Sequence, residues 1–188
     1  MDIVNPNLRA PRVPNARLGL LMTGLIVVAL ALLGMRSIEW FLLERSLRNR
    51  FPAVEWITTQ ELAGWLADKN RRPPLLVDVR TQAEWEVSHL AGAHHVLPAS
   101  AAEMALPDVP KDAPVVTYCA VGYRSAELAT KLRAAGFTHV QNLEGSIFQW
   151  ANEHRALVRD DGAPATHVHP YSSFWGRLLK DEARASLN

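Results

Sequence analysis

Short apolar runs alternate along the middle of the chain with stretches whose apolar side chains recur at helical spacing. This alternation predicts strands and helices in turn, and hence an α/β fold with a mostly parallel sheet covered by helices on both faces. The expected strands are Val54–Ile57, Leu75–Val79, Ala93–Val96, Val115–Tyr118 and His139–Leu143. The expected helices follow Thr58 and Thr81, lie near Ala99–Ala105, and extend over Ser125–Ala135 and Ile147–His154.

Two of the expected helices begin with a capping-box pattern, in which a threonine is followed three residues later by a glutamate. The pairs are Thr58 with Glu61 and Thr81 with Glu84. In such a pair each side chain accepts a hydrogen bond from the backbone N–H of the other residue, which satisfies two donors at the helix start. The pattern therefore predicts where both helices begin.

The first third of the chain has a different pattern, because Leu18 to Met35 runs for 18 residues without a charge. A helix that spans a bilayer needs about 17–25 apolar residues. We therefore expect a single-pass transmembrane helix over residues 18–35, in contact with membrane lipid. The alternative is a cleaved signal peptide, because Ala29-Leu30-Ala31 has the small-x-small form of a cleavage site.

The flanking charges hardly determine the orientation of this segment in the membrane. Three arginines precede the apolar run and four follow it closely, so the positive-inside rule barely separates the two orientations. A cysteine that has to stay reduced favours the cytoplasm, where disulfides are rare. We therefore expect the folded domain on the cytoplasmic side of the membrane.

The remaining segments divide the chain further. Residues 1–17 are expected to form a flexible leader, 36–53 a juxtamembrane segment with a helical extension, 54–158 the α/β domain, and 159–188 a C-terminal tail. Apolar residues between Ser173 and Ala185 fall on one side of a possible amphipathic helix. We expect this helix to dock on the domain, with binding to the membrane surface through Trp175 as the alternative.

The amino-acid composition argues against several classes of function. The chain has 20 basic and 19 acidic residues, a net charge of +1, and no long basic stripe, so no nucleic-acid partner is expected. A single cysteine excludes an internal disulfide framework and a multi-cysteine zinc site. The pairs His94-His95 and His167-x-His169 have no carboxylate or cysteine at ligand spacing, so no metal site is expected.

The single cysteine, Cys119, directly follows the expected strand Val115–Tyr118 and precedes a helix. Gly122 and Arg124 lie in the short turn between the two elements. The backbone N–H groups of the turn, the positive end of the helix and the arginine cation all favour the thiolate, which is the nucleophilic form of cysteine. A buried structural cysteine is the alternative, but it needs none of these three features.

The chain at this point resembles the rhodanese family of sulfurtransferases. The matching text is Leu76-Val77-Asp78-Val79-Arg80 with Glu84, Ser88–Ala93, Cys119–Ser125, Leu132 with Gly136-Phe137, and Leu143-Glu144-Gly145 with Trp150. The resemblance covers about residues 54–158 and implies a sheet of five parallel strands flanked by helices. Ser146 departs from the family pattern, in which a second glycine is common at this position.

The resemblance also implies roles for individual residues. It makes Cys119 the nucleophile and places Asp78 and Arg80 below the site as a supporting pair. It assigns the binding of the anionic group to a loop formed by Ala120, Val121, Gly122, Tyr123, Arg124 and Ser125.

The activity implied is the transfer of a sulfane sulfur through a Cys119 persulfide, from a thiosulfate-type donor to cyanide or a thiol, without a cofactor. An alternative is a persulfide carrier or membrane-tethered binding module that serves a sulfur-accepting protein without turnover. A third alternative is a cysteine phosphatase or arsenate reductase. Those enzymes have five residues between the cysteine and the arginine, whereas four separate Cys119 from Arg124, so this alternative is the least favoured.

Overall fold

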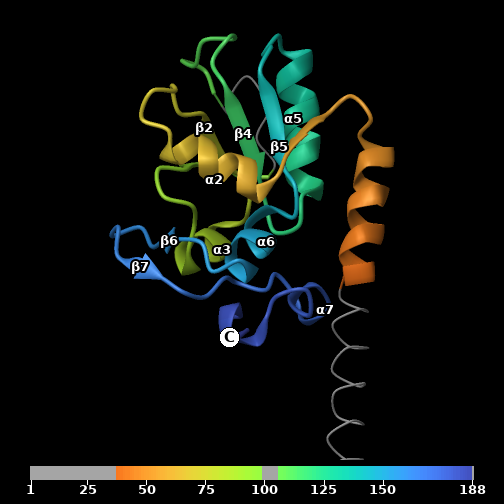
Figure 1. Cartoon of the computed structure of the whole chain (residues 1–188), viewed down its shortest axis with the longest axis vertical. Coiled ribbons are helices and arrows are strands. Elements are labelled where there is room, and N and C mark those ends of the chain that lie inside the picture. The colour runs from red at the N-terminus through yellow and green to blue at the C-terminus, as the bar shows by residue number, and fades with distance from the viewer. Residues whose placement is uncertain (1–36, 99–105, 188) are drawn as a thin grey trace, which may run out of the picture. The chain divides into compact units, whose positions relative to one another are not determined.

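The computed structural model describes residues 37–98 and 106–187 (Figure 1). The chain divides into two compact units, Met1–Glu39 and Trp40–Asn188, and every contact described below lies within the second. Its centre is a five-stranded parallel sheet with the strand order β1-β5-β4-β2-β3. The strands are β1 (Glu55–Ile57), β2 (Leu75–Asp78), β3 (His94–His95), β4 (Val115–Tyr118) and β5 (Val140–Leu143). The sheet and its flanking helices confirm the predicted fold class.

The main helices are α2 (Thr59–Ala67), α3 (Gln82–Val87), α5 (Tyr123–Ala134) and α6 (Ser146–Asn152). Both predicted capping boxes are formed, at the start of α2 and at the start of α3. Helix α5 begins two residues earlier than predicted, because Gly122 adopts a left-handed conformation (φ +109°) and serves as its N-cap. The predicted helix near Ala99–Ala105 lies outside the described residues.

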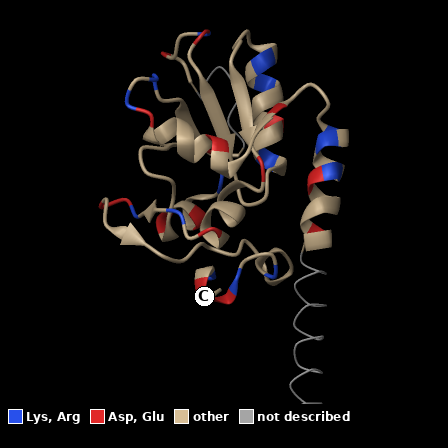
Figure 2. Ribbon diagram, viewed as in Figure 1, with Lys and Arg blue, Asp and Glu red and all other residues tan. Residues whose placement is uncertain are grey.

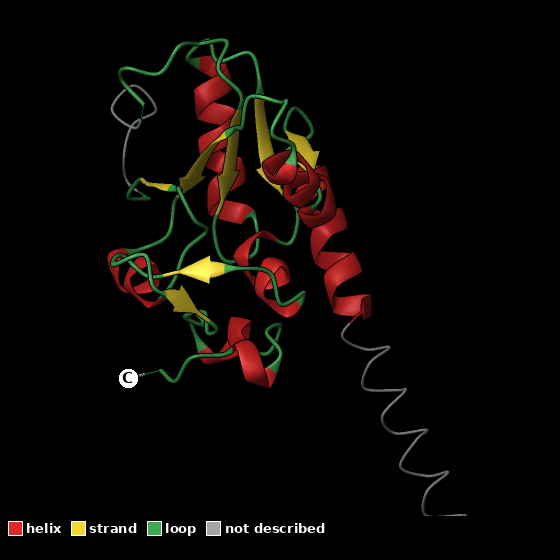
Figure 3. Cartoon of the chain, turned by 60° about the vertical axis from the view of Figure 1, so that its left-hand side comes forward, coloured by secondary structure: helices red, strands yellow, loops and turns green. Residues whose placement is uncertain are grey.

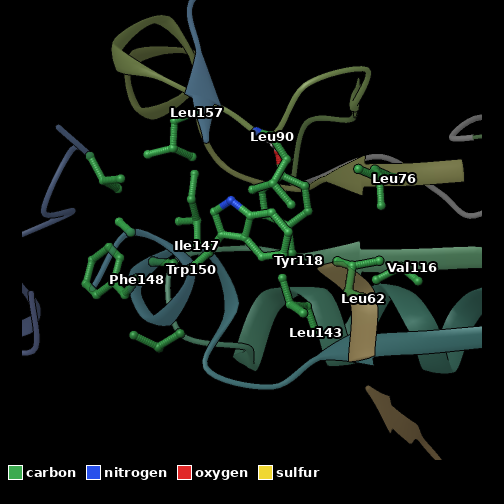
Figure 4. Close-up of a cluster of buried hydrophobic side chains, with 14 of the residues drawn as sticks. Leu62, Leu76, Leu90, Val116, Tyr118, Leu143, Ile147, Phe148, Trp150 and Leu157 are labelled. Carbon is green, nitrogen blue, oxygen red and sulfur yellow. Dashed lines mark hydrogen bonds between the residues drawn. The ribbon is translucent and has the colours of Figure 1, made fainter. Parts of the chain in front are cut away.

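Side chains alternate between the two faces of the sheet, so each strand contributes to two hydrophobic clusters. Leu76 and Val116 pack in one cluster with residues of α2 and α6, including Leu62 and Trp150. Figure 4 shows Trp150 beside Tyr118 in the middle of this cluster. Residues on the opposite face, among them Val77, Val115 and Val140, pack against Leu128, Ala129 and Leu132 of α5. The sheet is therefore covered on both faces, as parallel sheets require.

The predicted juxtamembrane segment 36–53 contains a helix over residues 37–50. Leu47 of this helix is buried, and Trp40 and Leu43 pack against the cluster that contains α2 and α6. Arg48 forms a bidentate ion pair with Glu144, with Nη2 at 2.8 Å from Oε1. Residues 40–50 of this helix are therefore part of the folded domain.

The predicted leader 1–17 and transmembrane helix 18–35 lie outside the described residues. Over residues 37–98 and 106–187, none of the helices combines the length and the apolar character that crossing a bilayer demands.

The C-terminal tail is joined to the domain rather than separate from it. Strand β6 (Leu157–Val158) pairs in antiparallel fashion with β7 (Pro164–Ala165), so the predicted boundary at residue 158 cuts through a hairpin. Leu178 and Leu179 are buried in the cluster that contains α2 and α6. Figure 3 shows this hairpin and the C-terminal segment beyond the carboxyl ends of the main strands. The tail therefore docks on the domain, as expected.

The predicted amphipathic helix over Ser173–Ala185 is wrong. The structure has a short helix α7 (Ser173–Gly176) and a 3₁₀ turn η1 (Asp181–Ala183). Asn152 of α6 accepts a hydrogen bond from the backbone N–H of Lys180 and donates one to the carbonyl of Leu178, both at 2.8 Å. These backbone groups are thereby removed from a helical ladder, and the chain turns so that two adjacent leucines are both buried.

Charged side chains of both signs are interspersed over the helices and loops in the view of Figure 2, while the strands carry few. Arg133 of α5, for example, pairs with Glu55 of β1 at 2.9 Å. This distribution fits the small net charge of +1.

Candidate active site

Cys119 is the first residue after β4, at the carboxyl end of a central strand. Its thiol is buried, and the backbone N–H of Gly122 donates a hydrogen bond to Sγ at 3.1 Å. The positive φ of Gly122 turns the chain directly into α5, so the start of a 12-residue helix lies close to the sulfur. The N–H group and the helix end both stabilise negative charge on sulfur. The local chain conformation therefore supplies the electrostatic setting that the sequence predicted.

Hydrogen bonds from α6 and β5 fix the backbone of Cys119 and of the loop that follows it. Ser146 Oγ accepts a hydrogen bond from the N–H of Cys119 at 3.2 Å, and the carbonyl of Cys119 accepts one from Ile147 at 3.2 Å. Asn142 donates to the carbonyl of Gly122 at 2.9 Å. The first two of these contacts come from the first turn of α6, so that turn fixes the backbone N–H and the carbonyl of Cys119.

Ser146 also belongs to the site. In the sequence it is recognisable only as a departure from the family pattern, in which a glycine is common at this position. It has φ +49°, in the left-handed region where glycine is favoured. Its hydroxyl accepts from the N–H of Cys119 and donates to the carbonyl of Leu143 at 3.2 Å. A glycine here would relieve the backbone but would leave the buried N–H of Cys119 without this acceptor. The serine is therefore explained by its contact with the loop.

Arg124 is positioned by Glu84 of α3. Its Nη1 and Nη2 atoms each donate to one carboxylate oxygen of Glu84 at 2.8 Å. Burial by itself lowers the pKa of the Arg124 guanidinium, but the hydrogen bonds to Glu84 and the attraction to Cys119 raise it by more. The pKa therefore lies above its ordinary value, and the guanidinium stays charged. Glu84 was expected as a helix cap and as part of the text that matches the family, but not as a partner of Arg124. It also directs the cation toward Cys119.

Asp78 and Arg80 form a fully buried ion pair, with Arg80 Nη2 at 2.7 Å from Asp78 Oδ2. Arg80 also donates to the carbonyl of Ser88 at 2.6 Å, which connects β2 to the segment after α3. Neither residue lines the cavity beside Cys119 among the described residues. The pair lies in the interior of the domain and takes no part in the wall of the site.

A cavity of about 140 Å³ opens beside Cys119. Its described lining residues are Cys119, Ala120, Val121, Tyr123, Arg124, Tyr171 and Trp175. Cys119 is only 1% exposed, so this cavity is the route by which a small reactant reaches the sulfur. Of the predicted loop, Gly122 and Ser125 are not part of this lining. Tyr171 and Trp175 come from the tail and were not predicted as site residues.

We expect the Glu84→Gln substitution to lower the free energy of unfolding by about 1.5–3 kcal/mol at neutral pH, the usual value of a hydrogen-bonded charged pair. Glutamine preserves the capping box, but it removes the charge that holds Arg124 and replaces one of the two acceptor oxygens by an NH2 group. Burial raises the pKa of Glu84, but Arg124 and Thr81 outweigh this, so its folded-state pKa lies below the usual value near 4.5. The stabilisation is therefore complete above about pH 4.5 and is lost as the pH falls through the folded-state pKa.

Urea unfolding of both proteins between neutral and acidic pH measures this effect. The matched control is Glu61→Gln, because Glu61 caps α2 through Thr58 in the same way and is exposed. The difference between wild type and Glu84→Gln should shrink below about pH 4.5. A difference that is independent of pH, or equal to that of the control, would contradict a stabilising pair between Glu84 and Arg124.

Comparison with known proteins identifies the family of this fold. The family model described as a rhodanese-like domain matches residues 58–153. A protein of Allochromatium vinosum named "Sulfurtransferase" is 35% identical over 109 residues, which are 58% of this chain and 99% of that protein. A "Probable adenylyltransferase/sulfurtransferase MoeZ" of Mycobacterium tuberculosis is 38% identical over 99 residues, 52% of this chain. The match spans about a quarter (24%) of the length of this mycobacterial relative.

Among solved structures, a protein from Bacillus halodurans superimposes with a TM-score of 0.52 at 20% identity. The superposition covers 62% of this chain and 85% of that one, and it shows a shared fold. The matched family segment contains Cys119, its loop and Glu84, and it ends before the tail. The chain therefore belongs to the family of rhodanese-like domains.

Proposed function

We propose that the protein is a sulfurtransferase that carries a sulfane sulfur on Cys119 as a persulfide. The observation that carries this proposal is the position of Cys119, which lines a small cavity and has its sulfur 3.1 Å from the backbone nitrogen of Gly122. Arg124 lines the same cavity and interacts with the sulfur. The names of relatives that are 35–38% identical give further support.

In the first step the Cys119 thiolate attacks the outer sulfur of a thiosulfate-type donor. The S–S bond of the donor breaks, and sulfite leaves with the bonding electron pair, so that Cys119 becomes a persulfide. In the second step cyanide or a thiolate attacks the outer persulfide sulfur, and Cys119 leaves as the thiolate. The N–H of Gly122 and the Arg124 cation stabilise the anion at sulfur in both steps.

The test is intact-protein mass spectrometry after incubation with an excess of a sulfane-sulfur donor. The expected result is a mass gain of one sulfur atom, mapped to the peptide that contains Cys119 and removed by cyanide. Cys119 is the only cysteine of the chain, so the site of modification is unambiguous. An unmodified protein, or sulfur that cyanide does not remove, would contradict the proposal.

In the same proposal residues 18–35 hold the domain at a membrane, with Cys119 on the cytoplasmic side. The support is the run of 18 uncharged residues. The full chain is expected to stay in the membrane fraction after extraction at alkaline pH, and a variant without residues 1–36 is expected in the soluble fraction. The mass of the N-terminal peptide separates an anchor from a cleaved signal. A full-length, uncleaved protein in the soluble fraction would rule out the anchor.

A further inference from the structure

The cavity beside Cys119 is built from two parts of the chain. One wall is the loop and the start of α5, which belong to the matched family segment 58–153. The other wall consists of Tyr171 and Trp175, which lie in the tail beyond that segment. The tail therefore adds to this rhodanese-like site a wall that the family segment does not supply.

The tail holds the backbone of these two aromatic residues in place. The N–H of Tyr171, which has φ +63°, donates to His169 Nδ1 at 3.0 Å. Ser172 caps α7 by accepting a hydrogen bond from the N–H of Trp175, and Gly176 lies so close to Pro170 that a Cβ atom would come within 2.7 Å of its side chain. Together with the buried Leu178 and Leu179, these contacts make the aromatic wall a built part of the site.

The charge of the cavity is small. Arg124 is the only charged residue in its described lining, and its guanidinium is already paired with both oxygens of Glu84. The Cζ atom of Arg124 lies over the ring of Tyr171, 4.7 Å from its centroid. The remaining lining consists of apolar and aromatic side chains and the Cys119 thiol. A doubly charged donor would therefore lose hydration without gaining a free cation in return.

We propose that Tyr171 and Trp175 are specificity-determining residues. They favour donors that have a single negative charge and carry the sulfane sulfur on an apolar arm, and they disfavour thiosulfate. The inference rests on the proposed sulfur transfer through Cys119 and names the class of donor for it. Burial of the apolar arm against the aromatic wall stabilises the bound donor, and the single negative charge of the donor faces Arg124 and the loop N–H groups.

The chemistry is the same for both classes of donor. With an organic thiosulfonate, the Cys119 thiolate attacks the terminal sulfur, the bond between the two sulfur atoms breaks, and the sulfinate leaves with the electron pair. With thiosulfate the leaving group is sulfite. Benzenethiosulfonate and thiosulfate therefore form a pair of probes that differ in charge and in the apolar arm but give the same Cys119 persulfide.

The experiment measures kcat/KM for thiocyanate formation from each probe, in the wild type, Tyr171→Gly and Trp175→Ala. Glycine suits the positive φ of residue 171, so that variant removes the ring and keeps the backbone. The ratio of the benzenethiosulfonate constant to the thiosulfate constant is expected to fall about tenfold in each variant, the usual effect of lost apolar contact in a pocket. Because both constants are measured on the same protein, their ratio does not depend on how much of the enzyme is folded.

Leu187→Ala is the matched control, because Leu187 lies in the same tail, is 49% exposed and is absent from the described lining of the cavity. Its ratio should equal that of the wild type. An unchanged ratio in Tyr171→Gly, or an equal loss with both probes, would overturn the aromatic wall as a selector while persulfide formation on Cys119 persists. Failure of both probes to form the persulfide in the wild type would instead overturn the sulfur transfer itself.

Discussion

Replacement of Cys119 by serine is expected to reduce sulfur transfer by at least about a thousandfold, because the reaction loses the atom that carries the sulfur. A serine hydroxyl at this position is not ionised near neutral pH and forms no persulfide. The measurement is thiocyanate formation at saturating donor and cyanide, together with the mass of the protein after incubation with the donor. The serine variant should show neither turnover nor the gain of a sulfur atom.

The fold of this variant should be preserved. Serine is close to cysteine in size, and the N–H of Gly122 that donates to Sγ can donate to a hydroxyl oxygen instead. The free energy of unfolding is therefore expected to change by about 1 kcal/mol or less. Alkylation of the wild type is an independent check, since Cys119 is the single thiol of the chain. Transfer near the wild-type rate by either the serine variant or the alkylated protein would remove Cys119 from the mechanism.

Much of the fold could be predicted because local patterns determine it. The buried strands Leu75–Asp78 and Val115–Tyr118 consist mainly of apolar residues, and the two capping boxes mark where α2 and α3 begin. The start of α5 was misplaced by two residues, because a glycine in a left-handed conformation can be the last residue of a turn or the cap of a helix. The sequence pattern does not separate these two uses.

The residues that complete the site were harder to predict, since they meet Cys119 and Arg124 only through the tertiary fold. Glu84 is 40 positions from Arg124, and Ser146 is 27 positions from Cys119. Trp175 was interpreted as a possible interfacial residue of an amphipathic helix, but it lines the cavity beside Cys119. Its position depends on Asn152, whose side chain binds the backbone at Leu178 and Lys180 and shortens α7.

The largest effect on stability is expected from Asp78→Asn, which should lower the free energy of unfolding by about 3–5 kcal/mol. Both members of the pair are fully buried, and asparagine keeps the shape of the side chain but leaves the Arg80 charge without its counter-ion. This loss is a large fraction of the roughly 5–15 kcal/mol that stabilises a typical domain. Urea unfolding measures it, with an unchanged m-value as the sign that the transition remains two-state.

The matched control for Asp78→Asn is Glu55→Gln, which breaks the exposed pair with Arg133 and should cost about 1 kcal/mol or less. A second variant separates the charge from the packing. Arg80 Nη1 is buried without a hydrogen-bond partner among the described residues, which leave the pair incompletely satisfied. The double replacement Asp78→Leu with Arg80→Met removes both charges and should recover most of the stability lost in Asp78→Asn, because apolar side chains of similar volume often match a buried ion pair. If the double variant is as unstable as Asp78→Asn, the unpaired charge of Arg80 is not the cause of the loss.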